Sequence, residues 1–222
     1  MAIYRKYDID PIVVDTNGIA ESQTLGGAGN VVLDGALCDL GTAAVFNITD
    51  AGYSDGIKGV QIGIQCGGDI NTVTFTITGT DQDGIAQTGT VTGVNGNTVE
   101  TTEYWRTITQ IAADGAVGSA ITIGPVDEII TQIIPLNWRN GQAPATYVVT
   151  GLSGTCQFDI DECFDSLNTA ALIQGATFFT NQSNKSADLA AVGTSHATGV
   201  RLKFDSYTSG AELQFHVRQS DN

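Results

Sequence analysis

The sequence predicts an all-β protein whose antiparallel strands form a sandwich, a jelly roll or a barrel. Residues 72–78 (TVTFTIT) alternate apolar and hydroxyl side chains without a break, which is the two-residue period of a strand with one buried face. Similar short stretches recur along the chain between turn residues, among them 27 glycines. Only 15% of the residues are charged, so a helical bundle, rich in Glu and Lys, is disfavoured.

Residues 1–30 are predicted to form an N-terminal arm, because they mix apolar and polar residues and end near a glycine-rich joint at 25–29. Residues 31–137 are predicted to form the first part of the sandwich. Within 1–137, strands are expected at 11–14, 30–40, 43–49, from Gly56 onward, 72–78, 88–93, 104–111, 120–123 and 127–136. Asn95-Gly96 is the strongest hairpin signal, because both residues tolerate the positive φ of a type I′ turn.

Residues 138–144 (WRNGQAP) are predicted to be a linker or a long loop, after which 145–222 form the second part of the sandwich. The two parts are expected to be either small β subdomains or one continuous jelly roll after the arm. The expected elements are strands at 145–150, 155–161, 199–205 and 211–218, a short helix within 166–175 and a polar loop at 181–195 with a helical turn at 187–191.

The net charge of −15 argues against nucleic acid and anionic membranes as partners, because both repel an acidic surface. Cys66 and Cys156 continue apolar alternations, and all four cysteines are expected to be reduced thiols. The N-terminus has no apolar signal segment, and no run is long enough to span a bilayer. The chain is therefore expected to be made in the cytoplasm.

An acidic turn and an acidic strand are the candidate ligand-binding clusters. Asp81-Gln82-Asp83-Gly84 resembles the start of a calcium loop, but Thr92 replaces the required Glu, so a β-turn is the better interpretation. Asp159 and Asp161 are expected to share one face of a strand, where they could act as a carboxylate pair. The preferred interpretation is a solvated strand face opposite Phe158 and Ile160.

The two histidines, His196 and His216, are too far apart in sequence for a paired metal motif, and His216 is expected to point away from the core between Phe215 and Val217. The sequence contains no Gly-x-Ser-x-Gly and no Walker A loop. We expect no catalytic residue, no cofactor and no metal, and therefore no enzyme.

Two segments carry a resemblance to known proteins. In residues 73–109, a strand, the turn at 79–84 and a second Thr-rich strand are followed by Tyr104-Trp105-Arg106-Thr107; residues 201–210 read RLKFDSYTSG before the last strand. Both segments resemble structural proteins of tailed-bacteriophage virions, and most closely jelly-roll decoration (cement) proteins. This resemblance implies a non-catalytic homotrimer that binds the major capsid protein and stabilises the outside of the capsid.

Two alternatives stay open. The chain could be a tail, head–tail or fibre component of the virion, or a carbohydrate-binding or adhesin β-sandwich. A sugar platform would need exposed aromatic side chains, for which the candidates are Tyr104, Trp105, Trp138, Tyr147 and Tyr207. For a decoration protein, the Thr-rich face of the strand at 72–78 is the predicted surface for contacts with other subunits or with the shell.

Overall fold

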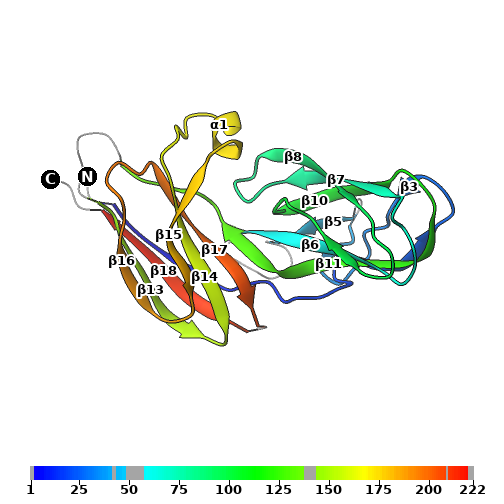
Figure 1. Ribbon diagram of the computed structural model, residues 1–222, viewed down its shortest axis with the longest axis horizontal. Coiled ribbons are helices and arrows are strands. Elements are labelled where there is room, and N and C mark those ends of the chain that lie inside the picture. The colour runs from blue at the N-terminus through cyan, green and yellow to red at the C-terminus, as the bar shows by residue number, and fades with distance from the viewer. Residues whose placement is uncertain (1–2, 42–43, 49–57, 138–143, 209, 220–222) are drawn as a thin grey trace. The chain divides into compact units, whose positions relative to one another are not determined.

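A computed structural model describes residues 3–41, 44–48, 58–137, 144–208 and 210–219, and nearly all of its regular structure is β-strand (Figure 1). The all-β prediction is confirmed. The helix α1 (Ala170–Gln174) lies inside the predicted range of 166–175 and begins after Thr169, whose hydroxyl accepts a hydrogen bond from Leu172 N at 3.3 Å. Among the described residues, no helix is long and apolar enough to cross a membrane.

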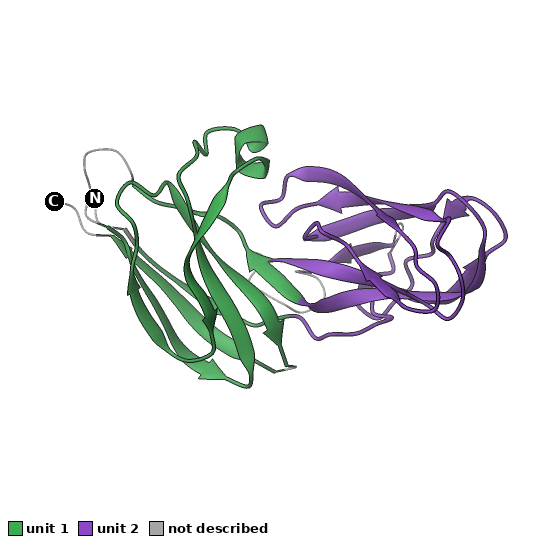
Figure 2. Ribbon diagram, in the orientation of Figure 1, with its two compact units in different colours: residues 1–11, 128–222 green, residues 12–127 purple. Residues whose placement is uncertain are grey.

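The chain folds into two compact units (Figure 2). Unit 1 contains residues 1–11 and 128–222, and unit 2 contains residues 12–127. Unit 2 is therefore inserted after the first strand of unit 1. This division differs from the predicted arm at 1–30 and from the predicted parts at 31–137 and 145–222. The expected linker at 138–144 lies outside the described residues except for Pro144.

Unit 1 is a sandwich of two antiparallel sheets. One sheet has the order β1-β18-β13-β16, and the other has the order β11-β17-β14-β15, with β12 pairing on β17. The strands are β1 (Ile3–Ile9), β11 (Val117–Thr131), β12 (Ile134–Pro135), β13 (Thr146–Ser153), β14 (Cys156–Cys163), β15 (Phe178–Lys185), β16 (Leu189–Val192), β17 (Gly199–Tyr207) and β18 (Glu212–Gln219). Only the end of β11, from residue 128 onward, belongs to unit 1.

The strand order of unit 1 is that of a jelly roll. With β12 left aside, numbering its strands one to eight along the chain makes one sheet 1-8-3-6 and the other 2-7-4-5. This alternation between two sheets is the double Greek key of a jelly roll. The jelly-roll expectation is therefore confirmed, and it applies to a unit that is interrupted by a long insertion.

Unit 2 has the same order. Its sheets are β2-β11-β6-β9 and β5-β10-β7-β8, which again number 1-8-3-6 and 2-7-4-5, while the short β3 and β4 pair with β10 and β5. The strands are β2 (Ala20–Leu25), β3 (Gly29–Asn30), β4 (Cys38–Asp39), β5 (Val45–Asn47), β6 (Lys58–Cys66), β7 (Thr74–Thr80), β8 (Ala86–Thr92), β9 (Thr98–Glu100) and β10 (Thr107–Ala113). Two jelly rolls, one nested in the sequence of the other, account for the described strands.

Alternating side chains build both cores. In unit 1, Phe158 and Phe204 are at most 1% exposed and their ring centroids lie 6.5 Å apart. In unit 2, Phe75 and Ile77 of β7 are fully buried while Thr74, Thr76 and Thr78 stay half-buried, as the alternation predicted. Each such buried side chain contributes roughly 1.5–3 kcal/mol relative to an exposed one.

Two local predictions were wrong because pairing partners lie far apart in sequence. The supposed N-terminal arm contains β1, which pairs with β18 from Ile3↔Gln219 to Ile9↔Leu213. The polar loop predicted at 181–195 instead contains β16 and much of β15. β15 and β16 are edge strands. β15 is largely polar and β16 has only four residues, so neither shows the alternation of apolar and polar residues that marks a strand.

Two further local predictions also failed. Residues 11–14 form no strand. At the predicted hairpin, Gly96 has a φ of +60° but Asn95 does not have a positive φ, and β9 pairs with β6 instead of β8. A type I′ turn requires positive φ at both central positions, so this turn is of another type. It leads from β8 to β9, which lies in the other sheet of unit 2.

Candidate functional site

Asp161 is held in a structural ion pair. It is 5% exposed and accepts hydrogen bonds from Nε and Nη2 of Arg201, both at 3.2 Å, and from the Thr180 hydroxyl at 2.9 Å. The Arg201 guanidinium carbon lies 3.6 Å from the centroid of the Phe178 ring. The predicted solvated strand face is therefore wrong for Asp161, because its carboxylate is buried with its charge matched.

Asp159 supports the neighbouring strand. It lies opposite Lys203 across the β14–β17 pair, and its Oδ1 accepts a hydrogen bond from Asn184 N at 2.7 Å. Asn184 has a φ of +52°, so this bond stabilises an uncommon backbone conformation in β15. Burial raises the pKa of Asp159; the bond from Asn184 opposes this effect, and the charges of Asp205 and Asp161 add to it.

Glu162, which the sequence did not single out, accepts four hydrogen bonds. It is 2% exposed and accepts hydrogen bonds from the Tyr147 hydroxyl at 2.7 Å, from Thr194 N at 2.8 Å and from the Thr194 hydroxyl at 2.7 Å, with Asn181 Nδ2 at 3.1 Å. Burial and this bond to Glu162 raise the pKa of Tyr147. Glu162 thus joins β13, β14, β15 and the loop after β16.

The acidic turn in unit 2 has a structural role. Oδ1 of Asp81 accepts hydrogen bonds from the backbone N–H groups of Asp83 and Ile85, at 3.0 and 2.8 Å, and Gly84 has a φ of +80°. The predicted β-turn is confirmed, and it connects β7 to β8. No group of three or more His, Cys, Asp or Glu side chains within the described part of the chain is arranged to hold a metal ion.

The cysteines are free, as expected. Cys66, Cys156 and Cys163 are buried and Cys38 is half-buried, and none of them forms a disulfide. Burial raises the pKa of Cys156 to about 11. Burial also raises the pKa of Cys38 to about 11, against the effect of a backbone hydrogen bond at Gly35.

The aromatic side chains that a sugar platform would need are largely buried among the described residues. Trp105 and Tyr147 are fully buried and Tyr207 is 6% exposed, while Tyr104 is half-buried. Trp138 lies outside the described residues. The four described side chains occupy or border the cores and present no aligned surface.

The Thr-rich strands form one uncharged face in unit 2. Thr74, Thr76 and Thr78 lie directly opposite Thr92, Thr90 and Thr88, and the three threonines of β8 are exposed. The strands β5, β7, β8 and β10 contain no charged residue. We call the outward side of this sheet the threonine face.

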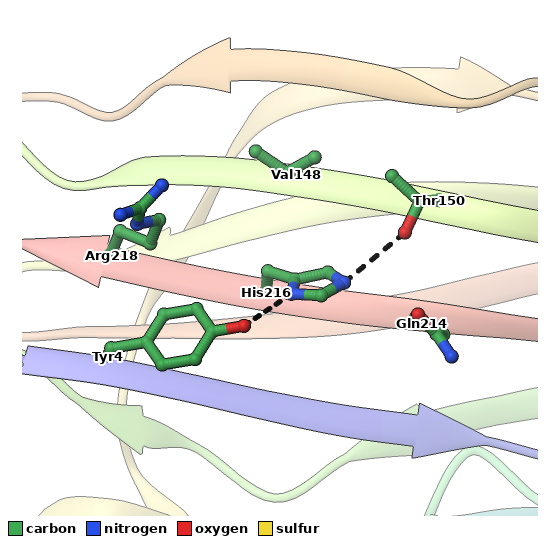
Figure 3. Close-up of a pocket in the computed structure, with 6 residues that line it drawn as sticks. All are labelled: Tyr4, Val148, Thr150, Gln214, His216 and Arg218. Carbon is green, nitrogen blue, oxygen red and sulfur yellow. Dashed lines mark hydrogen bonds between the residues drawn. The ribbon is translucent and has the colours of Figure 1, made fainter.

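The two histidines lie in different settings. His196 is exposed in the loop after β16 and has a φ of +70°. His216 points away from the core, as predicted, and its ring lies between two hydroxyls: Tyr4 Oη is 3.2 Å from Nδ1 and Thr150 Oγ1 is 3.2 Å from Nε2 (Figure 3).

His216 lines an open depression of about 360 Å³ on the outer side of the sheet β1-β18-β13-β16. The lining side chains are Tyr4, Val148, Thr150, Gln214, His216 and Arg218 (Figure 3). They come from β1, β13 and β18. The sequence could not reveal this group, because Tyr4 and His216 are 212 positions apart.

Comparison with protein-family models, with curated proteins and with solved structures found no match in any of the three.

Proposed function

We propose that this chain is a structural, non-catalytic component of a tailed-bacteriophage virion that binds and stabilises the outside of the capsid as a decoration protein. The proposal combines the sequence resemblance with the confirmed jelly-roll architecture. Its partners would be the major capsid protein and two further copies of the chain, and its location would be the capsid surface.

The observation that carries the proposal is the threonine face. The chain has a net charge of −15, yet four neighbouring strands of unit 2 contain no charged residue. Docking such a face removes no ionised group from water, and the centres of protein interfaces are depleted of charged residues. Threonine is also stiff at χ1, so little side-chain entropy is lost on binding.

The acidic residues of β14 support the same proposal. Asp161 is paired with Arg201, Asp159 supports the backbone at Asn184, and Glu162 accepts hydrogen bonds from three side chains and one backbone N–H. Each carboxylate is thereby held by hydrogen bonds within unit 1. We expect Asp159→Asn and His196→Ala to leave attachment to the capsid unchanged.

A charge placed on the threonine face tests the contact directly. Thr90→Glu puts a carboxylate on an exposed position of β8, where docking would bury it without a partner. We expect its binding to capsid shells that lack the protein to weaken at least tenfold, because burying an unpaired charge costs well over about 1.4 kcal/mol.

The matched control is Ser183→Glu, which adds the same charge at an exposed position of β15 in unit 1. Thermal unfolding of both variants checks that they are folded. Equal binding of Thr90→Glu, Ser183→Glu and the unaltered protein would show that the threonine face is not the contact. Microscopy of labelled virions that locates the protein on tails instead of capsid shells would contradict the decoration role itself.

A further inference from the structure

The depression on the outer side of the β1-β18-β13-β16 sheet has the side chains of a ligand-binding site (Figure 3). Its volume of about 360 Å³ is at the lower end of the range for small-molecule sites, roughly 300–1,000 Å³. The site is independent of the proposed capsid contact, because it lies in unit 1 and the threonine face lies in unit 2.

Arg218 supplies positive charge at this depression. It is exposed, and within the described residues its guanidinium makes one recorded contact, with the Tyr4 ring at 5.5 Å. The nearby charge of Lys6 is matched by Asp8 at 3.1 Å, and Glu212 lies two positions beyond Gln214 on β18. Arg218 is therefore the lining cation that is free to bind a carboxylate, which a guanidinium can hold through two hydrogen bonds.

The remaining polar groups suit a ligand with several hydroxyls. The Gln214 amide has no hydrogen-bond partner among the described residues, and it provides both donors and an acceptor. The hydroxyls of Tyr4 and Thr150 flank His216, and each has hydrogen-bonding capacity beyond its bond to the ring.

The apolar part of the lining suits a sugar ring. Tyr4 is 60% exposed, so its aromatic ring is available for packing, and Val148 lies half-buried on β13, on the other side of β18. A pyranose presents C–H groups on its faces and hydroxyls at its edge, which match an aromatic ring surrounded by hydrogen-bonding side chains. An inorganic anion would use Arg218 but has no apolar face to pack against the Tyr4 ring.

We propose that this depression binds an acidic sugar of the uronic acid type, with its carboxylate on Arg218, its ring against Tyr4 and its hydroxyls on Gln214 and Thr150. The expected affinity is weak for one sugar unit because the site is open, and it should rise for oligosaccharides that place several such units near several copies of the protein.

An NMR titration of the full chain with glucuronic acid tests the proposal. Three compounds serve as comparisons. The methyl ester of glucuronic acid lacks the charge, glucose lacks the carboxyl group, and acetate lacks the sugar ring. We expect saturable shifts with glucuronic acid at millimolar concentration, and binding at least tenfold weaker for all three comparisons. No binding of glucuronic acid, or equal binding of glucose or acetate, would overturn the proposal.

Two variants assign the binding to the depression. Arg218→Gln should weaken the binding of glucuronic acid at least tenfold. Tyr4→Ala should weaken the binding of both glucuronic acid and glucose. Arg5→Gln is the matched control, because it makes the same charge change next to Tyr4 on β1 but lies on the opposite side of the strand. Full binding by Arg218→Gln, or equal loss by Arg5→Gln, would show that binding occurs elsewhere.

Discussion

The hydrogen bond between Tyr147 and Glu162 offers a sharp test of how unit 1 is held together. Tyr147→Phe keeps the buried ring and removes only the hydroxyl, which donates to Glu162 at 2.7 Å. A hydrogen bond to a charged group contributes about 1.5–3 kcal/mol. Glu162 keeps its bonds from Thr194 and Asn181, so we expect the free energy of unfolding to fall by about 2 kcal/mol.

Denaturant unfolding monitored by circular dichroism measures this loss. Tyr4→Phe is the matched control, because it removes a hydroxyl from an exposed residue and should change stability by less than about 0.5 kcal/mol. A loss of less than about 0.5 kcal/mol in Tyr147→Phe would refute the assignment of Glu162 as a stabilising junction.

The same variant has a pH signature. The raised pKa of Tyr147 means that the folded state retains the phenol proton above pH 10, where the unfolded state releases it. Its contribution to stability is complete below pH 10 and falls above it by up to about 1.4 kcal/mol per pH unit. Tyr147→Phe should therefore lose stability less steeply above pH 10 than the unaltered protein.

Three further predictions concern other parts of the chain. Asp159→Asn should be more stable than the unaltered protein at pH 7, by less than about 1 kcal/mol, because a raised carboxyl pKa destabilises the ionised folded state. The gain should shrink as the pH falls toward the ordinary Asp value, and a constant gain in denaturant unfolding between pH 7 and pH 4 would refute this cause. Cys38 and Cys156 should react slowly with iodoacetamide at pH 8 in the folded protein, because burial raises each pKa to about 11. Both should react quickly once the protein is unfolded. Rapid labelling of the folded chain, measured by peptide mass spectrometry, would contradict their burial. Gly79→Ala should destabilise unit 2 by at least the roughly 1–3 kcal/mol typical of overpacking, because a Cβ would lie 1.9 Å from the backbone oxygen of Thr107. An unchanged thermal midpoint would show that β7 and β10 can separate at this point.

Much of the fold could be predicted from local patterns. The alternation in residues 72–78 located β7, and the Asp81–Gly84 turn was interpreted correctly because its side-chain and glycine geometry are local. The edge strand β15 was missed because it is largely polar and exposes residues on both faces, and β16 was missed because it has only four residues.

The arrangement in space depended on contacts that no short window contains. The pairing of β1 with β18 joins the two ends of the chain, and it converts a supposed arm into the first strand of a jelly roll. The depression around His216 follows from that pairing, as Tyr4 enters it only through β1. The network of Glu162 was hidden for the same reason, because its partners come from β13, β15 and the loop after β16.

The most direct test of the proposed function is sedimentation of the full chain with tailed-phage capsid shells that lack a decoration protein. We predict that the protein sediments as a trimer alone, that it co-sediments with shells lacking it until a fixed number of sites is filled, and that filled shells withstand higher temperature. A chain that stays behind as a monomer at saturating shell concentration, or that binds without changing shell stability, would contradict the account.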